Sequence, residues 1–429
     1  MSEVKTKQLM DTSEQYYKDT SLEHRKKYGQ YFTPESLKER ALSVVGPLKS
    51  GAKVLENSCG SGEFIKSILE KNAEIDITAY DIDSTLVELV REQFPSVDCH
   101  CQDYLLLEHK PIYDYVIGNP PYFQMTTKEA KEKGYEKLLD VCGGKPNIYS
   151  LFVRASIDSL APDGHLVFVV PTSMNNGADF KKLRKYIIET CDIEDIITYG
   201  SKEFDSALQN VMILHLRRLK ESEKNNGNYI FSKSNINIFS DDVSSLEKAF
   251  VDGKTLEELG FDVFTGNLVW NQNKDFMSRD SKDNVLLWTC NIVDNNIALD
   301  HPKLCLERPE GAEDAPKYQK GQYVKSDVNI SPLQGKCIVV NRVTGSGANA
   351  RIRAAIYDQQ GGYYIENHLN YIIEKKAALC SLNEIYDILI KQETTDFIKK
   401  LTGNTQISKN ELLRLIPFKV QSVIQNKGG

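Results

Sequence analysis

Residues 52–71 read AKVLENSCGSGEFIKSILEK, and the class of fold can be inferred from them. Its first residues form a short apolar run that predicts a strand, and its last residues have the periodicity of a helix. Gly60 and Gly62 lie in the turn between them, where the backbone can approach a ligand closely. A dinucleotide fingerprint would have a third glycine at position 65, but Ile65 stands there. A nicotinamide cofactor is therefore disfavoured.

The alternation of strands and helices continues as far as residue 219. Further strands are expected at 77–81, 113–118, 165–170, 193–199 and 211–217, and a helix at 148–160. This order predicts an α/β fold with a parallel sheet. The last two strands are too close in sequence for a parallel crossover, so we expect them to pair antiparallel and to give the sheet an antiparallel edge strand.

The polar stretch 220–228, KESEKNNGN, indicates a domain boundary. Beyond it we expect a second domain of α+β type, with strands at 338–343 and 363–373 and helices between about 382 and 415. The predicted division is an N-terminal extension (1–23), a catalytic domain (24–221) and a C-terminal domain (229–429).

Composition and charge narrow the class of protein. The chain has 429 residues, of which 41% are hydrophobic and 26% charged, as is typical of globular proteins. The net charge of −7 excludes attraction of the whole protein to a polyanion, so any nucleic-acid surface must be local. Nine scattered cysteines give no disulfide framework and no zinc pattern. With no apolar run long enough for a signal or membrane segment, we expect a cytoplasmic protein and no membrane partner.

Two acids follow successive predicted strands. Asp81, 19 residues beyond Gly62, could accept hydrogen bonds from both hydroxyls of a ribose, and Asp103 could accept from an exocyclic amine. Together they favour a nucleoside cofactor. The alternative is that both are strand-ending turn residues, which are common in α/β proteins.

Residues 119–122 read Asn-Pro-Pro-Tyr and follow the strand 113–118 directly. Two prolines fix φ and remove two N–H donors, so the Asn119 and Pro120 carbonyls are acceptors in a stiff turn. If the Asn119 side-chain oxygen and the Pro120 carbonyl each accept one N–H of a conjugated amine, the lone pair of that amine is freed for attack. Tyr122 could stack on the heterocycle. The alternative is a strand-ending turn with a buried tyrosine.

Residues 24–218 resemble the S-adenosylmethionine-dependent adenine-N6 DNA methyltransferases of the gamma arrangement, the TaqI-like group. The resemblance rests on Asn-Pro-Pro-Tyr, on the glycine turn, on Tyr28–Pro34 (YGQYFTP) and on Asn147-Ile148-Tyr149. It implies a class I methyltransferase sheet of Rossmann-like type, followed by a target-recognition domain. It implies that S-adenosylmethionine is the cofactor and that the cofactor is bound by Thr33, Glu56, Gly60, Gly62, Asp81, Asp103 and Tyr104. It also implies that Tyr122 and Phe204 enclose a flipped target base.

Some of these positions have simpler interpretations. Asn57 stands where the family commonly has a proline. Thr33-Pro34-Glu35 also reads as an ordinary helix start with a threonine cap. Phe204 is a lone phenylalanine before a strand, which is usually a core residue.

The second domain contains a basic stretch between Pro316 and Arg353, with seven bases and one acid. Its candidate DNA contacts are Lys317, Lys320, Lys325, Arg342, Arg351 and Arg353. Interleaved tyrosines and the Gly-rich loop 343–347 fit phosphate contacts. A solvated charged face is the alternative.

These features together predict methyl transfer to N6 of a flipped adenine in double-stranded DNA, without a metal. The protein would be the modification enzyme of a restriction-modification system, or an orphan counterpart. Any cognate restriction endonuclease would be a separate chain. Other conjugated amines remain alternatives: a protein glutamine amide, a guanine N2 in RNA, or a cytosine N4 in DNA.

Overall fold

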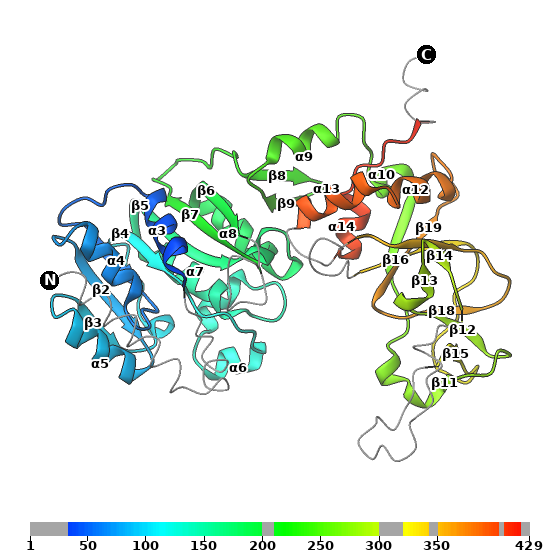
Figure 1. Ribbon diagram of the computed structural model, residues 1–429, viewed down its shortest axis with the longest axis horizontal. Coiled ribbons are helices and arrows are strands. Elements are labelled where there is room, and N and C mark those ends of the chain that lie inside the picture. Colours follow the sequence, from blue (N-terminus) through cyan, green and yellow to red (C-terminus); the bar gives the residue numbers. More distant parts are fainter. Residues whose placement is uncertain (1–32, 200–209, 300–320, 343–350, 403–406, 422–429) are drawn as a thin grey trace. The chain divides into compact units, whose positions relative to one another are not determined.

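The computed structural model describes residues 33–199, 210–299, 321–342, 351–402 and 407–421. The chain divides into two compact units. The first comprises Met1–Ser232 with Ile236–Val243, and the second comprises Lys233–Asn235 with Ser244–Gly429. Figure 1 shows the elements of each unit, which are described separately.

The first unit is built on a seven-stranded sheet with the order β3-β2-β1-β4-β5-β7-β6. The strands are β1 (Lys53–Glu56), β2 (Asp76–Asp81), β3 (Asp98–Cys101), β4 (Tyr113–Gly118), β5 (Leu160–Pro171), β6 (Cys191–Tyr199) and β7 (Val211–Arg218). The pairings among β1 to β5 are parallel, and β7 is antiparallel to both β5 and β6. This is the class I methyltransferase fold.

The predicted antiparallel pairing of the last two strands is confirmed. The predicted place of the antiparallel strand needs correction, because β7 lies one position in from the edge and β6 forms the edge. The connection from β5 to β6 passes over one strand position, and β7 then fills that position between them.

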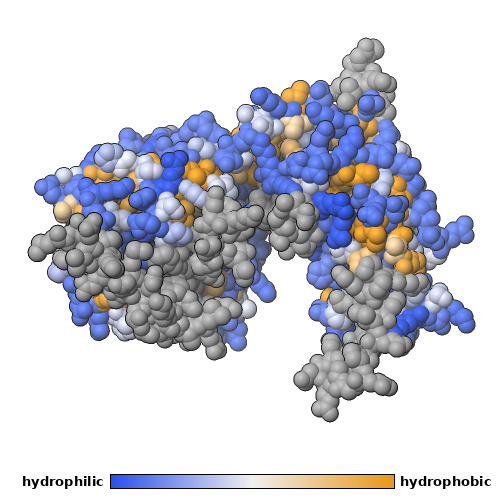
Figure 2. Space-filling view, viewed as in Figure 1, coloured by the Kyte–Doolittle hydropathy of each residue, from blue (hydrophilic) through white to orange (hydrophobic). Residues whose placement is uncertain are grey.

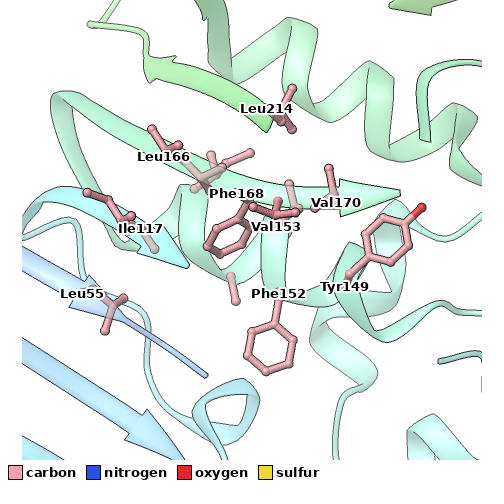
Figure 3. Close-up of a cluster of buried hydrophobic side chains, with 14 of the residues drawn as sticks. Leu55, Ile117, Tyr149, Phe152, Val153, Leu166, Phe168, Val170 and Leu214 are labelled. Carbon is pink, nitrogen blue, oxygen red and sulfur yellow. The ribbon is translucent and has the colours of Figure 1, made fainter. Parts of the chain in front are cut away.

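The helices of this unit are α3 (Glu35–Val44), α4 (Glu63–Lys71), α5 (Ser84–Gln93), α6 (Thr127–Glu132), α7 (Ile148–Ser159) and α8 (Lys181–Thr190). In β5, every residue from Leu166 to Val170 has no exposed surface, so both faces of the sheet are covered there. Figure 3 shows Tyr149, Phe152 and Val153 of α7 in the same cluster as strand residues of this core.

The hairpin β8 (Ile230–Lys233) and β9 (Ile236–Phe239) belongs largely to the first unit. The guanidinium of Arg184, on α8, is buried and its Nε donates to the Asn237 carbonyl at 2.8 Å. This anchor explains why the first unit continues past the polar stretch at 220–228, whereas the sequence placed the second domain from residue 229.

The second unit contains two four-stranded sheets and a two-stranded hairpin. One sheet has the order β10 (Phe261–Thr265), β19 (Leu369–Glu374), β16 (Cys337–Asn341), β17 (Ala354–Tyr357). The other has the order β11 (Met277–Ser278), β15 (Tyr323–Val324), β12 (Asn284–Leu287), β18 (Tyr363–Ile365), and the hairpin pairs β13 (Ile292–Val293) with β14 (Asn296–Ile297). The helices are α9 (Val243–Ala249), α10 (Leu256–Leu259), α12 (Leu382–Leu389), α13 (Gln392–Thr402) and α14 (Lys409–Arg414).

Two sequence-based expectations for this unit needed the structure to refine them. The single strand expected at 363–373 is two strands, β18 and β19, in different sheets. They are separated at Glu366, which is buried and whose carbonyl accepts from Leu369 N in a turn. Within the described residues, the helical region expected between about 382 and 415 consists of three helices, α12, α13 and α14.

The hydropathy of the surface and of the helices bears on whether the chain could cross a membrane. Figure 2 shows hydrophilic side chains over most of the face in view, with smaller apolar patches between them. Among the described residues, no helix has the length and apolar character needed to cross a membrane.

Candidate functional site

The glycine turn and the Asn-Pro-Pro-Tyr turn lie beside each other. They follow β1 and β4, which pair in parallel, so their carboxyl ends share one edge of the sheet. The strand order reverses between these two strands, and in open α/β sheets ligands bind at this switch point. Ser58 Oγ donates to the Asn119 carbonyl at 3.4 Å and links the two turns directly.

The two glycines serve different purposes. Gly60 has a φ of +54°, and a Cβ built there would meet no atom within 4 Å, so its backbone faces open space. Gly62 has a φ of +80°, and a Cβ there would lie 3.0 Å from the Phe94 ring and 3.1 Å from Val90. Gly60 is therefore the residue that permits close ligand approach, while Gly62 permits the turn into α4 and its packing against α5.

Glu56 is a buried carboxyl at the base of the site, with 2% of its surface exposed. Burial, with the nearby Glu63 and Asp81 carboxyls, raises its pKa well above the ordinary value. Its Oε2 has no hydrogen-bond partner among the described residues. Its Cγ lies 3.6 Å from where a Cβ on Gly118 would be, just before the Asn-Pro-Pro-Tyr turn. A buried carboxylate oxygen without a partner fits a cationic ligand group such as the ammonium of S-adenosylmethionine.

Asp81 joins the glycine turn to the next helix. Its Oδ2 accepts from Gly60 N at 2.8 Å and its Oδ1 accepts from Asp83 N at 3.0 Å. Burial raises the pKa of this carboxyl. Each carboxylate oxygen keeps a lone pair after one backbone contact, so both can also accept from ribose hydroxyls.

Asp103 has a capping role as well as the predicted site position. Its Oδ1 accepts from Leu105 N at 3.1 Å and so caps the 3₁₀ turn η1 (Tyr104–Leu106). Its Oδ2 accepts from the Tyr135 hydroxyl at 2.5 Å. The turn interpretation and the ligand interpretation are therefore compatible for this residue.

The Tyr104 side chain is buried against α7. Its side chain is 4% exposed, and its hydroxyl lies 2.6 Å from Ser159 Oγ at the end of α7. Burial raises its pKa, which keeps the hydroxyl protonated. Two apolar residues that sequence reasoning missed are exposed instead: Ile82 follows Asp81 and is 53% exposed, and Leu106 follows Asp103 closely and is 55% exposed.

The Asn119 amide is held at both ends. Its Nδ2 donates to Thr33 Oγ1 at 2.9 Å, and its Oδ1 accepts from the Tyr122 hydroxyl. Thr33 is 5% exposed. The interpretation of Thr33 as a helix cap is wrong, because the N-cap of α3 is Pro34, without a side-chain cap bond, and the threonine hydroxyl faces Asn119 instead.

Tyr122 is buried within the site, with 7% of its surface exposed. Its hydroxyl lies 2.6 Å from the Val169 carbonyl, and its ring meets Tyr149 edge-on, with 6.0 Å between centroids. The chain then leaves the turn beside the start of α7, where Ile148 N donates to the Phe123 carbonyl at 3.0 Å. Phe204, the second predicted stacking residue, lies outside the described residues.

The described basic residues of the second unit differ in their surroundings. Lys325 and Arg351 are exposed, whereas Arg342 and Arg353 are partly buried. Arg342 Nη1 donates to the Asn367 carbonyl at 2.9 Å, and Lys325 Nζ donates to the Asp275 carbonyl at 3.1 Å. Lys317, Lys320 and the loop 343–347 lie outside the described residues. Across the described ranges, no group of three or more His, Cys, Asp or Glu side chains could hold a metal ion.

Comparison with known proteins gives a match of residues 15–204 to the family described as Eco57I restriction-modification methylase. The Type II methyltransferase M.AccI of Acinetobacter calcoaceticus is 34% identical over 46% of this chain and 38% of its own length. The modification methylase CviBIII of Paramecium bursaria Chlorella virus NC1A is 22% identical over 97% of this chain and 100% of its own length. The chain thus spans well under half of the first relative and all of the second.

A solved structure, the type IIG restriction endonuclease BpuSI, aligns with a TM-score of 0.42 at 12% identity, over 90% of this chain and 59% of that protein. Residues 15–204 are therefore similar to the restriction-modification methylases that the Eco57I family model describes.

Proposed function

We propose that the protein transfers a methyl group from S-adenosylmethionine to N6 of adenine in double-stranded DNA. The observation that supports this proposal is the Asn-Pro-Pro-Tyr turn at 119–122, where hydrogen bonds fix the Asn119 amide next to the glycine turn. Two prolines leave no backbone donor at positions 120 and 121, and the Asn119 amide is bound by Thr33 on its nitrogen side, so its oxygen is the acceptor.

The cofactor would be held by residues from three neighbouring strand ends. Gly60 offers an open backbone, Asp81 and Asp103 offer carboxylate acceptors, and Glu56 offers a buried carboxylate oxygen. The exposed side chains of Ile82 and Leu106 supply apolar surface for a purine. When bound, the cofactor supplies a methyl group on a positively charged sulfonium, which is a good leaving group.

The chain contributes orientation and hydrogen-bond acceptors. Asn119 Oδ1 and the Pro120 carbonyl would each accept one N–H of the target amine, which pulls the nitrogen toward tetrahedral geometry. Placing the nitrogen in line with the methyl group removes the entropy cost of a bimolecular encounter. Because the Tyr122 hydroxyl contacts Asn119 Oδ1, we infer that it moves away from this oxygen when the amine enters.

Duplex DNA is the substrate favoured by the family and by the second unit. The matched family is one of restriction-modification methylases, and one relative is named a modification methylase. We propose that the second unit, predicted as residues 229–429, recognises the target sequence, and that Lys325, Arg342, Arg351 and Arg353 contact DNA together with Lys317 and Lys320.

A paired base must leave the helix to reach this turn. Tyr122 and Phe204 would then stack on the flipped adenine, with the catalytic unit predicted at 24–221. We further propose that the protein acts in the cytoplasm, and that any cognate endonuclease is a separate chain.

Cytosine N4 in DNA is the second candidate, because the same acceptor pair would activate its amine. The turn favours adenine, since the usual cytosine-N4 turn begins with serine and this one begins with Asn119. A protein glutamine or an RNA guanine is less favoured, because neither explains a second unit with a basic stretch.

Sequencing of DNA from cells that express the protein tests the proposal, with detection of N6-methyladenine and N4-methylcytosine. We expect N6-methyladenine at one short sequence, and its loss with Asn119→Ala. Methylcytosine at that sequence would favour the second candidate, and unmodified DNA beside methylated RNA or protein would refute both.

A further inference from the structure

Residues 125–146 follow the Asn-Pro-Pro-Tyr turn and form a loop whose two ends are hydrogen-bonded to each other, here called the arm. Its base is fastened where Met125 N donates to the Pro146 carbonyl at 3.0 Å. Within the arm lie α6 and the 3₁₀ helix η2 (Glu136–Val141). The arm therefore begins three residues after Tyr122 and returns to the start of α7.

Local sequence makes the first half of the arm rigid. Thr126 and Glu129 form a capping box at the start of α6. Gly134 ends the helix with a φ of +87°, and Tyr135 N then donates to the Ala130 carbonyl at 3.0 Å. This is the Schellman arrangement, in which glycine takes the left-handed position and the next residue bonds back to the last turn. The direction of Tyr135 is thus fixed by the end of the helix.

The side chain of Tyr135, which the helix end holds in place, contacts Asp103. The tyrosine is 4% exposed, and its hydroxyl donates to Asp103 Oδ2 at 2.5 Å. Burial and the adjacent carboxylate raise the pKa of Tyr135, so the hydroxyl keeps its proton and stays a donor. A second contact lies beside it, because a Cβ on Gly134 would be 3.1 Å from Leu106 Cδ2.

The two donors to Asp103 come from different segments of the chain and bind different carboxylate oxygens. Leu105 N binds Oδ1 and the Tyr135 hydroxyl binds Oδ2. Two fixed hydrogen bonds restrict rotation of the carboxylate and leave one lone pair on each oxygen. A carboxylate held this way can accept from an amine but repels a carbonyl.

We propose that Tyr135 is a positioning residue that orients Asp103 to select a 6-amino purine. Cofactor affinity then depends on the arm, residues 125–146, that follows the Asn-Pro-Pro-Tyr turn. This inference rests on the proposed function, because it takes Asp103 as the acid that binds the cofactor adenine.

The test measures binding to the full chain by calorimetry. The probes are S-adenosylhomocysteine and S-inosylhomocysteine, in which a carbonyl replaces the purine amine. We expect Tyr135→Phe to weaken binding of the adenosyl probe about tenfold, as for loss of a charge-assisted hydrogen bond. Binding of the inosyl probe should change less than twofold. In an Asp103→Ala background, Tyr135→Phe should have no further effect, since it acts through that carboxylate.

Tyr186→Phe is a matched control. The Tyr186 hydroxyl also donates to a carboxylate, Asp158 Oδ1 at 2.5 Å, but between α7 and α8. We expect this variant to bind the adenosyl probe as tightly as the wild type. If Tyr186→Phe weakened binding of the adenosyl probe as much as Tyr135→Phe does, general loss of stability would explain both effects, and the inference would be overturned.

Two other results separate the inference from the function on which it rests. A wild type that binds the adenosyl probe and a Tyr135→Phe variant that binds it equally well would overturn the inference alone. A wild type that binds neither probe would reject the proposed function and the inference with it.

Discussion

Replacing Thr33 by valine distinguishes two roles for this residue. The resemblance implies that the threonine binds the cofactor, whereas the structure shows its hydroxyl accepting from Asn119 Nδ2 at 2.9 Å. Valine keeps the branched shape and removes the acceptor. The Asn119 amide then loses the contact that distinguishes its nitrogen from its oxygen. An unpaired buried donor costs about 1 to 3 kcal/mol, which corresponds to a loss of roughly five- to a hundredfold in rate.

Single-turnover methyl transfer at saturating cofactor and DNA measures this loss. We expect the rate to fall in that range for Thr33→Val, with cofactor affinity changed less than threefold. Thr33→Ser keeps a hydroxyl and should restore most of the rate. If Thr33→Val instead weakens cofactor binding and leaves the saturated rate intact, the proposed orienting role is wrong.

Further predictions concern the glycine turn and two buried titratable groups. Gly60→Ala should abolish cofactor binding with a small loss of stability. Gly62→Ala should lower the melting temperature strongly, because the Cβ at position 62 would meet the Phe94 ring and the Cβ at position 60 would not. Calorimetry that shows lost binding for Gly62→Ala and a strongly lowered melting temperature for Gly60→Ala would contradict these assignments. Because burial raises the Glu56 pKa and a cationic ligand requires the ionised form, affinity for S-adenosylmethionine should fall as pH drops below that raised pKa, by up to about tenfold per pH unit. Glu56→Gln should bind weakly without this slope, and a retained slope would exclude Glu56. Burial, with the adjacent His165, lowers the His215 pKa to about 4. The unfolded chain therefore binds the extra proton between about pH 6.5 and 4, and stability should fall by about 3 kcal/mol across this window as pH drops. In denaturant titrations His215→Leu should remove that part of the decline, and an identical decline would refute the cause.

The sequence predicted those parts of the site that depend on local pattern. The helix expected at the end of 52–71 is α4 (Glu63–Lys71), because its start follows a glycine turn and its apolar periodicity is clear. The adjacency of the glycine turn and the Asn-Pro-Pro-Tyr turn was predictable from the alternation of strands and helices, since carboxyl ends of parallel strands share one edge.

Long-range contacts were beyond local pattern. The hydroxyls of Thr33 and Tyr135 meet partners 86 and 32 residues away, and no periodicity signals such a contact. The burial of the Tyr104 side chain was not predictable either, because its hydroxyl partner, Ser159 on α7, lies 55 residues further along the chain. The division at Glu366 was missed although the polar residues Glu366-Asn367-His368 interrupt the apolar run, which is a local sign of a turn.

The need for the Asn119 acceptor can be measured with Asn119→Ala, when binding and turnover are determined on the same preparation. We expect cofactor and DNA dissociation constants within about threefold of the wild type, and a single-turnover rate lower by about a hundredfold or more, as for removal of one preorganised polar contact at the reacting centre. Transfer at the wild-type rate would show that the acceptor at 119 is not needed, and would contradict the mechanism.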